Sequence, residues 1–214
     1  NAYFLAGDDQ NLLIDTGFNQ AECRQAMDQA MEEIGFSMEN TDIFITHCHS
    51  DHAGLAGYLA KPETRIYTGD YTARDISRQF DWFEDFGILV QQGGLLDMDL
   101  DQNPINHPGY RYRTDKVDFN QVTVVADGTI INVGDYSLKC VHTTGHAPDH
   151  ICLYEENHKI LFCGDHILET ITPNNNIWET PWDIKVDYLD EYLKSLTKVE
   201  ALAIDLILHA HRGH

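Results

Sequence analysis

The stretch Thr46-His47-Cys48-His49-Ser50-Asp51-His52 decides how this sequence is interpreted. The apolar run 43–45 before it predicts a buried strand, and the segment after it predicts a short helix over 54–60. The stretch is therefore expected on the loop between them. Residues two apart in an extended chain project to the same side, so His47 and His49 can face one target. Three imidazoles and one carboxylate within six residues suit zinc or iron.

A purely structural interpretation makes the same stretch a polar loop in which Asp51 only caps the following helix. Composition alone rarely produces three histidines and one aspartate at these spacings, so the metal interpretation is favoured. Cys48 lies between two proposed ligands, but strand geometry points it away from them, toward the core. An isolated histidine is more often a surface or core residue than a metal ligand. Seven further histidines occupy no motif position and are not assigned as ligands. They are His107, His142, His150, His158, His166, His209 and His214.

Length and hydropathy predict a single domain over residues 1–214. The chain has 214 residues of which 43% are hydrophobic, enough for one sizeable core. It begins at Asn1 without a methionine, inside what reads as a strand, so flanking segments are expected to be missing. No run of about 18 apolar residues and no signal-peptide pattern occurs, so no membrane-spanning helix is expected.

The charge balance indicates a small-molecule substrate as the partner. Lysine and arginine number 14 against 35 aspartates and glutamates, giving a net charge of −21. Such a surface repels polyanions, which argues against nucleic acid and anionic membranes as partners. The five cysteines form no pairing pattern, which is typical of reduced thiols in a cytoplasmic protein. The composition does not decide between a monomer and a homodimer.

The order of predicted elements favours sheets covered by helices. In the first part the patterns predict strands 3–5, 12–15, 42–46 and 65–68 with helices 20–34 and 54–60. In the second part they predict strands 122–126, 129–133, 136–143, 151–154, 159–163 and 203–208 with a helix over 187–200. Gly35 is expected to end the first helix. Asp127-Gly128 predicts a hairpin between strands 122–126 and 129–133.

Residues 71–120 depart from this pattern and predict a mostly helical insertion with loops. The segment is rich in aromatic residues and shows no repeat. It either extends the packing or covers the site as a lid and pocket wall, and the lid is favoured because long insertions in catalytic folds usually supply cover. A later loop over 172–182 carries Trp178, for which substrate contact and core burial are equally favoured.

The pattern His-x-His-x-Asp-His resembles the signature of the metallo-β-lactamase superfamily. Four more elements of that superfamily have counterparts here in the same order. They are Leu13-Ile14-Asp15-Thr16-Gly17, Thr144-Gly145-His146, Phe162-Cys163-Gly164-Asp165 and Ile207-Leu208-His209-Ala210-His211-Arg212-Gly213. The resemblance spans the chain from about Tyr3 and implies an α/β (α+β) fold, the four-layer αββα sandwich.

The resemblance also implies a ligand for each metal position. His47, His49 and His146 would hold the first metal, Asp51, His52 and His211 the second, and Asp165 would bridge them. Asp15 would fix a histidine ring by a hydrogen bond. The implied cofactor is a pair of Zn²⁺ ions, with iron or manganese as alternatives. A bridging hydroxide would then attack a small activated acyl substrate, and Asp51 would orient it or return a proton.

Within the superfamily the residues favour a glyoxalase II-like or lactonase-like hydrolase of a thioester, lactone or ester. Class B β-lactamases with a bridging cysteine do not match Asp165, and flavodiiron proteins carry a glutamate at the position of His49. The helical glutathione-binding region of glyoxalase II is not present, and the acidic composition argues against the metal-dependent nucleases. A mononuclear iron persulfide dioxygenase stays open as the alternative, ahead of a β-lactamase or a metal-dependent nuclease. At the end of the chain, the resemblance selects His211 over His209 and His214.

Overall fold

The computed structural model describes residues 1–80, 106, 108–175, 178 and 186–212, and within them the strands form two five-stranded sheets. The first sheet has the order β1 (Tyr3–Leu5), β2 (Asn11–Ile14), β3 (Thr41–Phe44), β4 (Ile66–Thr68), β5 (Val122–Val124). The second has the order β10 (Leu206–His209), β9 (Ile160–Gly164), β8 (Ile151–Glu155), β7 (Tyr136–His142), β6 (Ile130–Val133). In the first sheet only the β1–β2 pair is antiparallel, and in the second only the β9–β10 pair is parallel.

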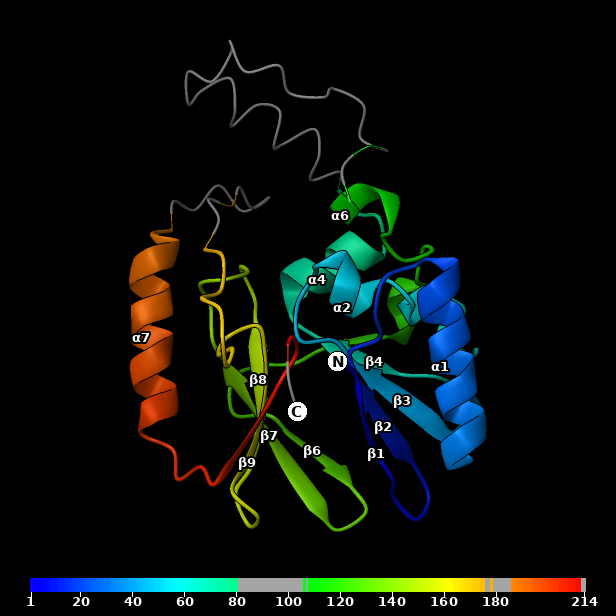
Figure 1. Ribbon diagram of the computed structural model, residues 1–214, viewed down its shortest axis with the longest axis horizontal. Helices are drawn as coiled ribbons and strands as arrows, with labels where there is room; N and C mark the ends of the chain where they lie inside the picture. The colour runs from blue at the N-terminus through cyan, green and yellow to red at the C-terminus, as the bar shows by residue number, and fades with distance from the viewer. Residues whose placement is uncertain (81–105, 107, 176–177, 179–185, 213–214) are drawn as a thin grey trace.

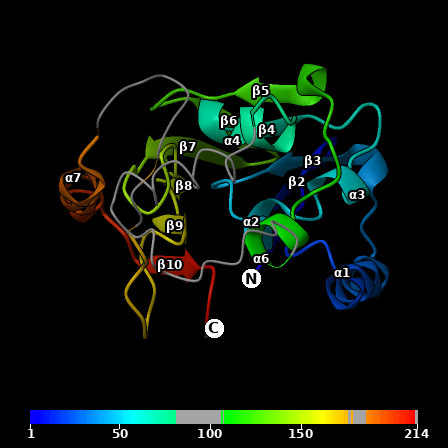
Figure 2. The same cartoon turned by 90° about the horizontal axis from the view of Figure 1, so that it is seen from above.

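The two sheets pack face to face, with helices on their outer sides (Figures 1 and 2). Helix α1 (Ala21–Ile34) flanks the first sheet and α7 (Tyr188–Glu200) flanks the second. The shorter elements are η1 (Met38–Asn40), α2 (Ser50–Ala53), α3 (Ala56–Leu59), α4 (Asp70–Ile76), α6 (Pro108–Arg111) and η3 (Phe119–Gln121). This confirms the predicted α/β class and its helix–sheet–sheet–helix layers.

Three hydrophobic clusters account for these layers. Leu12 and Ile14 face the cluster between the sheets, whereas Leu13 faces the cluster that α1 covers. On the other side Leu153 faces the space between the sheets, and Cys152 packs toward Val199 of α7. Successive strand residues point to opposite faces, so a strand covered on both faces needs apolar residues throughout. The unbroken apolar runs in the sequence follow from this double burial.

The helix predicted over 54–60 was wrong in its start and its continuity. The chain turns helical at Ser50 and forms α2, so Asp51 and His52 lie on a helix and not on the predicted loop. The amide of Leu55 bonds the hydroxyl of Thr16 at 3.0 Å instead of a helical carbonyl, and α3 follows as a separate helix. Gly35 does end α1, with the left-handed φ of 69° that glycine permits.

The hairpin predicted at Asp127-Gly128 was also wrong. The amide of Val125 donates to the carbonyl of Thr68 in the first sheet, whereas the amide of Gly128 donates to the carbonyl of Cys140 in the second. The turn therefore carries the chain from one sheet to the other, and the hairpin lies between β6 and β7. Turn residues indicate that a strand ends, but the partner of the next strand depends on which face each strand buries.

The described parts of the 71–120 segment are helical at α4, α6 and η3, and its residues 81–105 and 107 lie outside the described ranges. No helix among the described residues is long and apolar enough to cross a membrane.

Candidate metal centre

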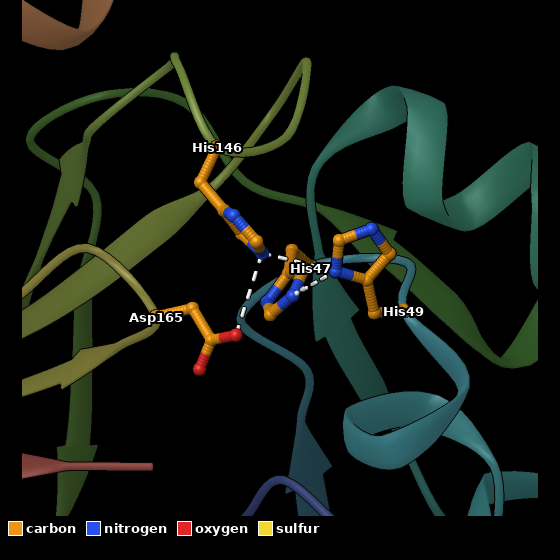
Figure 3. A group of neighbouring side chains, drawn as sticks. All are labelled: His47, His49, His146 and Asp165. Atoms are coloured by element: carbon orange, nitrogen blue, oxygen red, sulfur yellow. Dashed lines mark hydrogen bonds and ion pairs between the residues drawn. The ribbon is translucent and has the colours of Figure 1, made fainter. Parts of the chain in front are cut away.

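Four side chains from loops at one end of the two sheets form the first ligand group. His47 and His49 follow β3 of the first sheet, and His146 and Asp165 follow β7 and β9 of the second. Figure 3 shows the two pairs approaching each other from opposite sides. His49 Nδ1 lies 2.9 Å from His47 Nε2 and 3.0 Å from His146 Nε2. The ligand atoms of all four residues lie within 4.8 Å of one another.

The hydrogen bonds around His146 show that this group suits a cation. Its Nδ1 lies 2.6 Å from the carbonyl oxygen of Asn174, which can only accept, so Nδ1 carries the proton. In the neutral ring Nε2 is then a bare lone pair. That lone pair faces Oδ2 of Asp165 at 3.4 Å and Nδ1 of His49 at 3.0 Å. A cation bound by these atoms would replace their mutual repulsion with coordination.

The second group comes from α2 and from the segment after β10. Asp51 and His52 lie on α2, and His211 lies two residues beyond the end of β10. Asp51 Oδ2 lies 3.2 Å from His211 Nε2 and 3.8 Å from His52 Nε2. The ligand atoms of these three residues also lie within 4.8 Å of one another. This arrangement supplies one carboxylate and two imidazoles.

Asp165 contacts both groups. Its Oδ1 lies 3.1 Å from His211 Nε2 and 3.3 Å from His52 Nε2, while its Oδ2 lies 3.4 Å from His146 Nε2. Both Oδ1 of Asp165 and Nε2 of His52 are buried, and neither makes a hydrogen bond to the described residues. Buried polar atoms without hydrogen bonds are costly, and a coordinated cation would satisfy both.

Asp15 supports the second group from behind. Its Oδ2 lies 2.7 Å from Nδ1 of His52, which leaves Nε2 of that ring facing Asp51 and Asp165. The backbone amide of Thr46 donates to Oδ1 of Asp15 at 2.9 Å, and the Thr46 hydroxyl also donates to this carboxylate. Asp15 has a φ of 57°, a left-handed conformation that aspartate tolerates better than most residues. The sequence prediction that Asp15 hydrogen-bonds a ligand histidine agrees with this contact.

The protonation states of the two groups differ. Burial is the largest cause that lowers the pKa of His47 and His146, and it lowers the pKa of His49 to about 3. Neutral imidazole is the form that binds metal. In the second group, the adjacent carboxylates of Asp165 and Asp51 raise the pKa of His211 to about 9.

Carboxylates dominate the charge state of the second group. Burial disfavours the charged form of His52, but the neighbouring carboxylates of Asp15 and Asp165 raise its pKa well above the usual value. Burial raises the pKa of Asp51, yet the contact with His211 and the charges of the other nearby histidines outweigh it and bring that pKa to about 2. Without a cation, protons on the rings therefore balance the carboxylates. A bound cation would displace those protons.

Among the histidines that spacing did not select, those within the described residues belong to neither group. His209 Nε2 lies 3.8 Å from Glu169 Oε2, and the exposed His158 pairs with Glu155. Strand β10 ends at His209, so His209 and His211 do not share one extended strand, and Nε2 of His211 lies beside Asp51 and Asp165 instead. His142 bonds a carbonyl of Val125, while His107 and His214 lie outside the described residues. Cys48 joins neither group among the described residues.

Two contributors, Thr46 and Asn174, were not singled out by sequence reasoning, whereas Trp178 was. The Thr46 hydroxyl contacts Asp15 and also lies 3.0 Å from Nδ1 of His47. Asn174 orients His146 through its carbonyl, and backbone carbonyls carry no sequence signal. Trp178 donates from Nε1 to the carbonyl of His146 at 3.1 Å, and its ring centroid lies 5.5 Å from that of His49. Trp178 is half-buried, and these two contacts place it against the first ligand group.

Nearly the whole chain matches one protein family. The family model described as the metallo-beta-lactamase superfamily matches residues 1–211. The chain belongs to that superfamily. A relative from Bos taurus named acyl-coenzyme A thioesterase MBLAC2 is 24% identical over 220 residues, covering 99% of this chain and 72% of the relative. A protein from Aspergillus fumigatus named atrochrysone carboxyl ACP thioesterase is 26% identical over 202 residues, covering 94% of this chain and 47% of that protein.

Solved structures of metallo-beta-lactamase proteins share the fold. A family protein from Thermus thermophilus superposes with a TM-score of 0.83 at 23% identity, covering 100% of this chain and 68% of that one. The MIM-2 metallo-beta-lactamase superposes with a TM-score of 0.68 at 19% identity, covering 98% and 69% of the two chains. Superfamily membership together with the two histidine–aspartate groups makes the protein a metallo-hydrolase.

Proposed function

We propose that this metallo-beta-lactamase superfamily member uses a binuclear, zinc-type centre to hydrolyse a small activated acyl substrate, and that the substrate is a thioester. The observation that carries the proposal is the placement of Asp165, whose two oxygens face different ligand groups. His47, His49 and His146 would hold one cation, and Asp51, His52 and His211 the other. Asp165 would contact both. Two divalent cations, when bound, make water nucleophilic near neutral pH and polarise a carbonyl.

Asp51 is the residue of this set best placed to handle a proton. Its side chain is 27% exposed, against 10% for Asp165, so it is the more accessible of the two carboxylates. Its lowered pKa keeps it charged at neutral pH, and a charged carboxylate can orient an attacking water. In thioester hydrolysis the water oxygen bonds the acyl carbon, the carbon–sulfur bond breaks and a proton passes to the leaving thiolate. We assign the transfer of that proton to Asp51.

The thioester is proposed because of the relatives. Both the Bos taurus and the Aspergillus fumigatus relatives are named thioesterases, one for acyl-coenzyme A and one for an acyl carrier protein. A thiolate leaving group needs less help from a protein acid than an alkoxide or an amine. This agrees with a centre in which the described carboxylates are held charged.

The test is metal quantification followed by a hydrolysis panel. Protein purified without chelator is expected to contain about two zinc-type ions per chain. It should release free thiol from acyl-coenzyme A or N-acetylcysteamine thioesters faster than it opens lactones, esters or β-lactams. Asp51→Asn should lower thioester turnover without emptying the three-histidine site. A single tightly bound iron with oxygen consumption on a persulfide would overturn the hydrolase assignment.

A further inference from the structure

His150 is fully buried beside the metal centre but belongs to neither ligand group among the described residues. It lies between the loop that carries His146 and the start of β8. Its ring centroid is 5.0 Å from that of His47 and 6.3 Å from that of His146. A buried imidazole so close to a metal site requires hydrogen-bond partners, and both of its nitrogens have one.

The hydrogen bonds of His150 allow one tautomer. The backbone N–H of Asp165 points at Nε2 of His150 at 3.2 Å, and because an N–H can only donate, Nε2 must be unprotonated. The ring proton is then on Nδ1, which lies 2.7 Å from the hydroxyl oxygen of Thr143. That hydroxyl is free to donate in turn to the carbonyl of His150 or to the sulfur of Cys152.

The turn that presents Asp165 packs directly on this ring. Gly164 has a φ of 49°, and a Cβ at this position would lie 2.8 Å from Nε2 of His150 and 2.9 Å from the hydroxyl of Thr46. Both distances are too short for a side chain, so only glycine brings the backbone this close. The amide of Ile151 bonds the carbonyl of Thr46 at 3.0 Å and ties His150 to the loop before His47. The ring therefore lies between the backbone segments that carry His47 and Asp165.

We propose that His150 is a positioning residue that fixes the metal-contacting carboxylate of Asp165. Its bare Nε2 accepts the Asp165 amide, and its Nδ1 proton, held by Thr143, keeps Nε2 bare. The direction in which the Asp165 side chain leaves the turn determines whether its two oxygens reach both ligand groups. This inference rests on the proposed binuclear function, but the tautomer of His150 does not depend on any bound metal.

The first test is long-range ¹H–¹⁵N NMR on the metal-free and the metal-loaded protein. His150 is expected to show a protonated Nδ1 and a bare Nε2 in both samples. A proton on Nε2, or a doubly protonated ring, would overturn the inference. If the wild-type protein binds no metal at all, the proposed function fails while this measurement still reports on His150.

The second test compares three variants by metal titration, with thermal unfolding to show that each is folded. His150→Leu removes the acceptor and should weaken the binding of one of two zinc ions by roughly tenfold or more. His150→Gln, whose amide oxygen can accept the Asp165 amide, should restore most of that affinity. The control is His166→Leu, since His166 is equally buried and is not hydrogen-bonded to the Asp165 amide.

Equal zinc affinity in wild type and folded His150→Leu would contradict the proposal. Equal losses of affinity in His150→Gln and His150→Leu would also contradict it, because the loss would then reflect packing and not the hydrogen bond. Should His150→Leu fail to fold, the Gln variant and the NMR tautomer still decide. A zinc deficit in His166→Leu as large as that in His150→Leu would likewise count against a specific role.

Discussion

The two ligand groups lie side by side, yet the protein prepares them for a cation in different ways. In the first, burial keeps His47, His49 and His146 neutral, so their nitrogens are available as lone pairs. In the second, carboxylates hold His52 and His211 toward the protonated form. The first group therefore attracts a cation by ligand convergence, and the second by negative charge. We infer that metal loading of the two sites responds to different substitutions.

The difference begins within one short stretch of chain. His47 and His49 lie in the bend between β3 and α2, whereas Asp51 and His52 lie on α2, so one motif supplies both groups. The bonds from the amides of His52 and Ala53 to the carbonyl of His49 mark the point where the chain turns helical. A change of backbone conformation at this point, and not a distant insertion, separates the two sites.

The largest effect is expected from Asp165→Asn, because Asp165 is the residue that the two groups share. A neutral amide cannot offer an anionic oxygen to each side, so the second metal should be weakened most. We expect kcat/KM to fall on the order of 1,000-fold while the fold is retained. Elemental analysis and circular dichroism on the same sample measure both outcomes.

A matched control for Asp165→Asn is Asp149→Asn. Asp149 lies three residues after His146, and its carboxylate accepts from the amide and hydroxyl of Thr72 at 2.8 Å each. An amide oxygen can still accept one of these bonds, and neither ligand group is touched. Loss of metal in the control equal to that in Asp165→Asn would show that general charge, and not bridging, governs metal content.

The next effect separates the groups directly. His211→Ala removes a ligand from the second group only, and we expect it to release roughly one of two metals and lower activity about 100-fold. His209→Ala should retain both metals, because His209 lies next to Glu169. If His209→Ala alone empties a site, the ligand assignment at the end of the chain is off by two residues.

A smaller effect is expected from Asp15→Asn, which acts on the second group from behind. The amide nitrogen would face Nδ1 of His52, where the carboxylate now lies at 2.7 Å. A donor at that position favours the His52 tautomer with its proton on Nε2, the atom that must bind metal. We expect roughly tenfold weaker binding of one metal, read by competition with a chelator.

The control for Asp15→Asn is Asp42→Asn. Asp42 is another buried carboxylate of the first sheet, on β3, and it accepts from the amide of Arg65 at 2.9 Å. It contacts neither ligand group, so its loss should cost stability without changing metal affinity. Weakening of both metals alike in Asp15→Asn would remove the distinction between the groups.

The candidate ligands of the contiguous motif could be found from the sequence, because four of them fall within six residues after an apolar run, and the structure brings their side chains into the two groups. The more distant ligands His146, Asp165 and His211 were expected from the resemblance, since no local pattern joins residues that meet only through sheet packing. The prediction of a hairpin at Asp127-Gly128 was wrong for a related reason, because a turn signal does not indicate which sheet the next strand joins. The register shift between Leu208 and His209 could not be predicted from the sequence either.

Supporting contacts were the least predictable part of the site. The role of Asp15 was expected from the resemblance, and its bond to His52 agrees with that expectation. The roles of Thr46 and His150 depend on hydrogen bonds between segments far apart in the chain, such as Asp165 to His150. Hydrogen-bond direction is a property of assembled geometry, and residue type alone does not encode it.

The smallest effect is expected from Trp178→Phe, which sharpens the comparison because Trp178 touches only the first group among the described residues. The change keeps an aromatic ring near His49 and removes the bond from Nε1 to the carbonyl of His146. A neutral hydrogen bond contributes about 0.5–1.5 kcal/mol net. Because each 1.4 kcal/mol is about tenfold, thioester turnover should fall about two- to tenfold. Metal content should stay close to the wild-type value. If a small amount of metal is lost, it should come from the three-histidine site. Selective loss of the other metal would show that the two groups are coupled through more than Asp165.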